Sequence, residues 1–266
     1  MMAEILLTPR ELLYIAALLD APEFIGLSDA FFGMDETEMR HEITVLQLSL
    51  AKKGYAEMDF DGGFALKNEV CEVVGVCAAC DTLAVVDKNK TSRPQFRELY
   101  YASGGLIIKM DEKEGVKVLS PVSNKDILLE LIIRDVEFRD SEVLLKNIRI
   151  SNDVLADVSE QVDESDLSGG IKTLIENGCD ELSAEAIVEG LTGGANYYAV
   201  AITAFEGTNE GTRSIMLIDT KFGIFRMIPI SNDDTDIIQF DALKAGQAKA
   251  VLTDFIRTIF ENQREV

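Results

Sequence analysis

One order of structural patterns occurs twice along the chain, and this repetition constrains the fold more than any other feature of the sequence. Four short runs rich in β-branched and aromatic residues precede a helical pattern at 83–135, and the same order returns at 198–260. Matching positions, such as Met110 and Met227, are mostly offset by about 115 to 118 residues. The spacing indicates one duplicated unit rather than a solenoid array.

Each block predicts an antiparallel meander, because short polar or Gly-containing turns join its strand-like runs. The runs are 83–86, 99–102, 106–110 and 116–119 in the first block, and 198–203, 213–219, 223–228 and 237–240 in the second. Two such units would form one sheet with helices on one face, and the other face must be covered or used for binding. Identity between the blocks is low, so two unrelated meanders of similar order remain an alternative.

The segment 8–66 resembles a winged helix: three helices followed by a two-stranded wing. Thr8 with Glu11 and Asp35 with Glu38 match the capping box that starts a helix. This shape often binds DNA, but the helix before the wing begins with several acids, which phosphates would repel. The pattern therefore favours the shape without the DNA-binding function.

The fold class expected from these patterns is α+β, with two pseudo-symmetric halves around a central antiparallel sheet and helices packed on it. We expect a single domain over 1–266, with an N-terminal half at 1–137 and a C-terminal half at 138–266. The C-terminal half would repeat the pattern of 68–135.

The net charge of −22 makes nucleic acids and anionic lipids poor candidate partners, because such a chain repels phosphates and anionic lipids. No apolar run reaches the roughly 18 uncharged residues that a membrane span needs, so membrane insertion is not expected. The start of the sequence lacks the pattern of a secretory signal, and four cysteines give no disulfide framework. A cytoplasmic location follows as an expectation.

Candidate catalytic groups are few, and each has a simpler structural explanation. His41, the one histidine, has no recognisable nucleophile around it. Cys77 and Cys80 have the C-x-x-C spacing, but no second ligand pair accompanies them. The acidic run 231–236 lacks the spacing of an EF-hand loop. We therefore expect no enzyme activity, no metal and no cofactor.

Several diffuse stretches carry a resemblance to a known family: 7–13, 186–190, 193–194, 197–202, 210–213, 218–224 and 229–231. Over these stretches the chain resembles the EspG family, the cytosolic chaperones of type VII (ESX) secretion. The resemblance implies a single domain of two pseudo-symmetric halves. It also implies a role in keeping helical secretion substrates soluble before export. The implied partner is a helical secreted protein of the PE/PPE or WXG kind.

Three polar loops are candidate partner-binding segments: 87–97, 205–212 and 231–236. Aromatic residues often dominate interface energies, so Phe96 and Phe205 are the first candidate anchors. The full candidate set is Arg93, Phe96, Arg97, Phe205, Glu210, Arg213, Asp233 and Asp234. Each loop could equally be an ordinary hairpin connection.

Other functions stay open from the sequence. The chain could be a winged-helix-type transcriptional regulator or a structural component of a protein assembly. An unrecognised enzyme would need a deep pocket with converged carboxylates, for which Asp219 and Asp236 are the candidates.

Overall fold

The computed structural model describes residues 3–21, 24, 26–59, 61, 63–91, 93–140, 145–206, 209–232 and 235–261. The described side chains leave out 93–96, 206, 209–210, 231–232, 235 and 258–261. The residues group into two compact units, each with its own internal packing. Unit 1 contains the residues up to Ala84, Glu98–Leu128 and Thr203–Gly211, and unit 2 contains Val85–Arg97, Leu129–Ile202 and the residues from Thr212 on.

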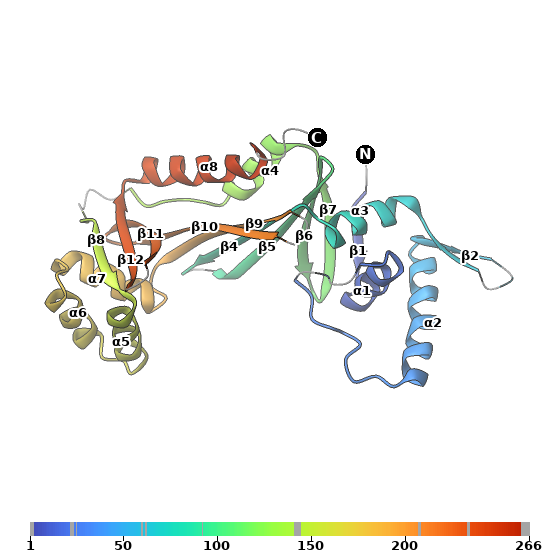
Figure 1. Ribbon diagram of the computed structural model, residues 1–266, viewed down its shortest axis with the longest axis horizontal. Coiled ribbons are helices and arrows are strands. Elements are labelled where there is room, and N and C mark those ends of the chain that lie inside the picture. The colour runs from blue at the N-terminus through green and yellow to red at the C-terminus, as the bar shows by residue number, and fades with distance from the viewer. Residues whose placement is uncertain are drawn as a thin grey trace. The chain divides into compact units, whose positions relative to one another are not determined.

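The same series of elements runs through the chain twice (Figure 1). The first series is β1 (Ile5–Leu7), α1 (Pro9–Leu18), α2 (Glu36–Lys52), β2 (Ala56–Met58), β3 (Phe64–Leu66), α3 (Asn68–Ala78), β4 (Thr82–Lys90), β5 (Arg93–Ser103), β6 (Leu106–Lys113), β7 (Val116–Val122) and α4 (Lys125–Ile133). The second is β8 (Ile148–Ser151), α5 (Asn152–Asp163), α6 (Leu167–Glu176), α7 (Glu181–Leu191), β9 (Asn196–Glu206), β10 (Asn209–Thr220), β11 (Gly223–Asn232), β12 (Thr235–Leu243) and α8 (Ala245–Glu261). Each is a strand, three helices, four strands and a helix; only the first adds the β2–β3 hairpin.

The strand order of the large sheet repeats this symmetry. Ten strands lie in the order β1-β7-β6-β5-β4-β9-β10-β11-β12-β8, so each four-stranded meander is extended by the short strand that precedes its helices. The pairs β1–β7, β5–β6 and β6–β7 are antiparallel, and so are β10–β11, β11–β12 and β12–β8. The predicted α+β class with a central antiparallel sheet is confirmed.

The hydrogen-bond register shows the repetition at single-residue precision. Leu99 pairs with Met110 in the first series and Met216 pairs with Met227 in the second, so both partners shift by 117 positions. The next strand shifts by 121 positions, from Leu119 opposite Met110 to Phe240 opposite Met227. The four extra positions arise because the β11–β12 hairpin continues for two more residues on each strand.

Helix starts follow the capping residues of the sequence. Both capping boxes, Thr8 with Glu11 and Asp35 with Glu38, are formed. Helix α7 starts at Glu181, because the carboxylate of Asp180 accepts a hydrogen bond from the Ser183 N–H and caps the helix there. In the described part of 19–35 there is no helix, so two helices, rather than three, precede the β2–β3 hairpin.

The predicted polar loops are largely strand. Strand β4 extends to Lys90 and β5 begins at Arg93, while β9 extends to Glu206 and β10 begins at Asn209. Polar side chains in these strand ends find partners within the sheet, as Asp87 does with Arg97. Hydrophobic periodicity does not detect such pairs, so strand ends of this kind resemble loops in sequence.

In unit 2, both faces of the sheet are covered near β11. Phe225 packs edge-on against Phe240, with ring centroids 5.6 Å apart, in a core shared with α5, α6 and α7. The preceding residue Ile224 points to the opposite face and is only 1% exposed. Helix α8 contacts β11 and buries its apolar stripe of Ala248, Leu252 and Ile256. The second face of the sheet was expected to be either covered or used for binding, and near β11 it is covered.

Candidate functional site

The predicted contact residues with described side chains, Arg97, Phe205 and Arg213, lie on strands β5, β9 and β10. The guanidinium of Arg97 is exposed and donates two hydrogen bonds to the carboxylate of Asp87, at 2.7 and 3.1 Å. This pairing raises the pKa of Arg97. The backbone N–H of Phe205 donates to the carbonyl of Asp81, and the Phe205 ring is half-buried. Arg213 is exposed on β10.

The remaining contact candidates cannot be described as side chains. Arg93, Phe96 and Glu210 lie in strands β5 and β10, but their side chains fall outside the described set. Asp233 and Asp234 lie outside the described residues. Arg97 and Arg213 belong to unit 2 and Phe205 belongs to unit 1, so the candidates do not form one cluster within a unit.

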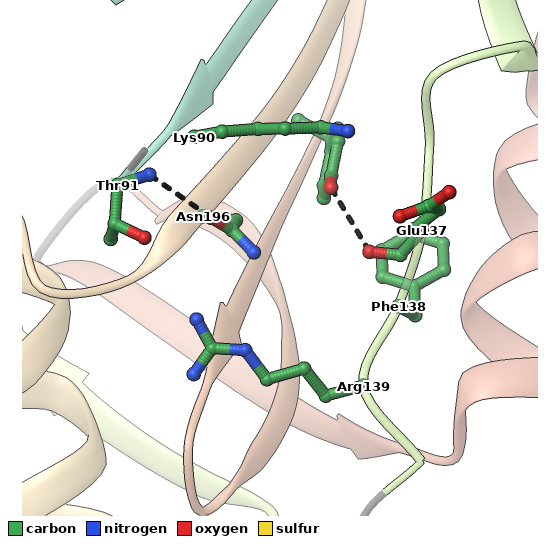
Figure 2. A pocket seen from close by; sticks show the side chains of 7 residues that line it. Lys90, Thr91, Glu137, Phe138, Arg139 and Asn196 are labelled. Carbon is green, nitrogen blue, oxygen red and sulfur yellow. Dashed lines mark hydrogen bonds between the residues drawn. The ribbon is translucent and has the colours of Figure 1, made fainter. Parts of the chain in front are cut away.

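A pocket of about 490 Å³ opens within unit 2, where the start of β9, the end of β4 and the linker after α4 meet (Figure 2). Its size lies within the range typical of ligand pockets. It is lined by Lys90, Thr91, Glu137, Phe138, Arg139, Asn196 and Tyr198.

The linker wall of the pocket is held by Tyr198 of β9. The Tyr198 hydroxyl donates a hydrogen bond of 3.1 Å to the backbone carbonyl of Glu137. The rings of Phe138 and Tyr198 meet edge-on, with centroids 5.1 Å apart. These contacts fix the linker against β9 and thereby place Arg139 at the pocket (Figure 2).

The opposite wall is organised by Asn196, the first residue of β9. Its side-chain oxygen accepts a hydrogen bond of 3.1 Å from the Thr91 N–H, and its amide nitrogen donates one of 3.2 Å to the carboxylate of Asp219. The same carboxylate oxygen lies 3.9 Å from Nε of Arg139. Asp219 therefore contacts both walls of the pocket, through Asn196 on one side and Arg139 on the other.

Asp219 is a buried carboxylate in an unusual position. It is 0% exposed, and within the described residues its Oδ1 has no hydrogen-bond partner. Burial raises the pKa of Asp219, and nearby Glu189 adds to the effect, while Asn196 and Arg139 oppose it. By the register shift of 117, the matching position in the first series is Ala102, opposite Ile107 as Asp219 is opposite Ile224. The fold does not require an acid at this place.

Other groups considered for chemistry are dispersed. Asp236, the second carboxylate considered for an enzyme, is exposed on β12, and His41 is exposed on α2. Burial raises the pKa of Cys80 to about 11 and raises the pKa of Cys77 well above its ordinary value, so neither thiol ionises readily. Among the described residues, no group of three or more His, Cys, Asp or Glu side chains could hold a metal ion.

Sequence reasoning found one member of this pocket system, Asp219, and missed the rest. Asn196 and Tyr198 occur in a run that looks like an ordinary strand start, and Arg139 lies in a linker without periodicity. Only the tertiary fold brings the positive charge of Arg139 next to Asp219. No local pattern could have indicated it.

The comparisons with known proteins give one informative result. No protein-family model and no curated protein matches the chain. Among solved structures, the chain is similar to the Mycobacterium tuberculosis type VII secretion system chaperone EspG5 in its complex with a PE25–PPE41 dimer. The TM-score is 0.62 at 12% identity, covering 97% of this chain and 96% of EspG5.

The chain has an EspG-like fold. At this level of identity the likeness shows the fold alone. Among the described helices, none is long and apolar enough to span a membrane.

Proposed function

We propose that the chain is a cytosolic chaperone or adaptor that binds helical substrates of a type VII secretion system and keeps them soluble for export. The observation that supports this most is the similarity to EspG5, which extends over almost the full length of both chains. A shared core motif alone would cover less. The solved structure shows EspG5 in complex with a PE25–PPE41 dimer, so a helical secreted protein of the PE/PPE or WXG kind is the proposed partner.

The charge of the chain is compatible with this role. A net charge of −22 keeps a protein soluble and monomeric, which suits a chain that must cover an aggregation-prone partner. The same charge opposes binding to duplex DNA, so no observation favours the winged-helix regulator. The proposed role is a binding function without catalysis.

The proposed partner surface includes the eight candidate residues named from the sequence. Of these, Arg97 and Arg213 are described and exposed. Arg97 is already neutralised by Asp87, which leaves Arg213 as the better probe of a charged contact. Phe205 is half-buried, so its truncation would mix effects on stability and on binding.

Co-expression provides the first test. A two-helix secreted protein from the same organism is produced with and without the chain, and its soluble fraction is measured. We expect the chain to raise that fraction severalfold and to co-purify with the partner. Equal solubility with and without the chain, combined with salt-sensitive binding of the chain to duplex DNA, would favour a regulator instead.

Charge reversal at Arg213 then tests the surface. Arg213→Glu should weaken the complex by about tenfold, about 1.4 kcal/mol, and leave the free energy of unfolding nearly unchanged. The matched control is Arg257→Glu, which reverses the charge of an exposed side chain on α8. If both variants bind like the unaltered chain, Arg213 is not part of the interface.

A further inference from the structure

The pocket of unit 2 presents more hydrogen-bond donors than its own residues use. Within the described residues, Nζ of Lys90 and both Nη atoms of Arg139 have no hydrogen-bond or ion-pair partner. Asn196 Nδ2 donates one of its two hydrogens to Asp219 and has a second available. Such a set of donors around one cavity suits an acceptor-rich, negatively charged group.

We propose that this pocket binds a carboxylate, supplied by an acidic group of the chain's protein partner. Only the identity of the molecule that carries the carboxylate, a protein partner, rests on the proposed function. Its chemistry rests on the pocket itself. An aspartate or glutamate side chain and a free C-terminus carry the same group, and the experiment below separates them.

Arg139 is positioned in advance for this role. Its Nε lies 3.9 Å from the buried Asp219 carboxylate, and Asp219 also accepts a hydrogen bond from the Arg139 backbone N–H. Figure 2 shows the side chain extending from the linker toward Asn196, with its terminal nitrogens on the pocket side. A planar guanidinium held at Nε can offer its Nη atoms to a carboxylate as a pair, at little further cost in conformational entropy.

Asp219 is better explained by this role than by folding. A carboxylate that is 0% exposed costs free energy unless charges and hydrogen bonds compensate for it, and here Oδ1 has no partner in the described residues. The matching position of the first series holds Ala102 in the same register, so the sheet forms without the acid. What the acid adds in the second series is the placement of Arg139 and Asn196.

The remaining walls fit a carboxylate on a short apolar stem. The edge-on rings of Phe138 and Tyr198 provide a surface against which methylene groups can pack. Glu137 is the one acid among the lining residues and is exposed, so water screens its charge. The distributed negative charge of the chain is screened over about 8 Å at physiological salt, so short contacts to Arg139 and Lys90 dominate.

A titration followed by ¹⁵N-resolved NMR of the full chain tests the proposal with three peptides. The first is N-acetyl-Gly-Gly-Glu-Gly-Gly-amide, whose only carboxylate is a side chain. The second is N-acetyl-pentaglycine with a free C-terminus. The third replaces the glutamate of the first with glutamine and carries no charge. The signals to follow are the Thr91 N–H, the Asn196 side-chain amide and the Arg139 Nε–H.

We expect at least one carboxylate peptide to shift these signals saturably, and the peptide that binds more tightly identifies the source. Arg139→Gln should weaken that binding about tenfold or more, and Asp219→Asn should weaken it less, because the guanidinium remains but is no longer held. Arg257→Gln, on α8, is the matched control and should bind like the unaltered chain. A dispersed spectrum for each variant shows that it is folded.

Three results would overturn the proposal: no shift with either carboxylate peptide, equal shifts with the glutamine peptide, or unchanged binding by Arg139→Gln. Binding of a helical partner by the Arg139→Gln variant at full strength would overturn the pocket's part in partner recognition while leaving the chaperone function in place. Carboxylate binding by a chain that binds no helical partner would support the pocket as a carboxylate site and overturn the chaperone function.

Discussion

Glu11 shows how one side chain can serve both a helix start and the core. It is only 1% exposed, and its carboxylate accepts hydrogen bonds from the Thr8 N–H at 2.7 Å, the Ser49 hydroxyl at 2.7 Å and the Lys53 ammonium at 2.6 Å. Burial alone would raise its pKa, but Lys53 and the other donors outweigh this, and the pKa of Glu11 is lowered. The carboxylate therefore links α1 to α2.

Glu11→Gln should lower the free energy of unfolding at pH 7 by about 2 kcal/mol, since it leaves donors of a largely buried network without a charged acceptor. A lowered folded-state pKa means that this stabilisation is present above the ordinary pKa of 4.5 and is lost as the pH falls below it. Urea unfolding at several pH values measures both effects. Glu42→Gln, which breaks the more exposed pair with Arg10, should cost less than about 1 kcal/mol. Equal losses for the two variants would contradict the account.

Two aspartates with opposite pKa shifts provide a paired prediction in unit 2. Burial raises the pKa of Asp219, so its ionised form destabilises the fold as the pH rises through that pKa, and Asp219→Asn should stabilise the chain at pH 7 by about 1 kcal/mol. For Asp241, burial is outweighed by hydrogen bonds from Arg226 and Gln239, and its pKa is lowered. Asp241→Asn should destabilise the chain by about 1 kcal/mol.

For Asp219→Asn the difference from the unaltered chain should shrink as the pH falls toward the ordinary pKa of 3.8. For Asp241→Asn the difference should persist down to pH 3.8 and shrink only below it. Thermal unfolding between about pH 2.5 and pH 8 measures both differences. If both variants changed the stability in the same direction, the claim that burial destabilises the ionised form of Asp219 would be contradicted.

At the level of single residues, composition and motif spacing indicated a chain with few groups suited to catalysis, and Asp219 was named, together with Asp236, only as a candidate carboxylate of an enzyme pocket. They could not indicate Arg139 or Asn196 as its neighbours, because 57 and 80 residues of β-rich and helical sequence separate Arg139 from Asn196 and from Asp219. Contacts of that separation are created by strand order and register, which local patterns do not determine.

Among the elements, helices with capping residues were the easiest to predict. The Asp35 carboxylate accepts hydrogen bonds from the N–H groups of Thr37 and Glu38, and the Asp35 N–H donates one to the Glu38 carboxylate. Both residues lie within four positions of the helix start, so sequence alone reveals the box. Strands β1 and β8 could not be predicted as strands of the sheet edge, because three- and four-residue segments acquire that identity only by pairing with β7 and β12.

The cap of α2 gives a prediction for a whole element. Asp35→Ala should lower the free energy of unfolding by about 1 kcal/mol, because two N–H groups of the first turn lose their acceptor. Circular dichroism during urea unfolding measures the change. The comparison variant is Glu36→Ala, at the residue after Asp35, which removes an exposed ion pair with Arg40. It should lower the free energy of unfolding by about 0.5 kcal/mol or less. A larger effect at Glu36 than at Asp35 would mean that charge, rather than capping, governs this helix start.

Across the whole molecule, the repeated order of elements was predictable because each series contains four strand patterns and a closing amphipathic helix. The register shift of 117 across β5–β6 and β10–β11 goes beyond what the sequence could show, because identity between the series is low. We propose that 1–137 and 138–266 arose as two copies of one unit. The prediction of long polar loops failed, because ion pairs such as Arg97 with Asp87 stabilise polar strand ends.

The chain shares the EspG-like fold at 12% identity, and the binding function proposed above for it has to be tested directly. The most direct test is sedimentation velocity of the purified chain with a purified two-helix secreted protein from the same organism. The account predicts one stoichiometric complex whose mass is the sum of the components, with the partner aggregating when alone. Separate sedimentation of a soluble partner and a free chain at micromolar concentrations would contradict it.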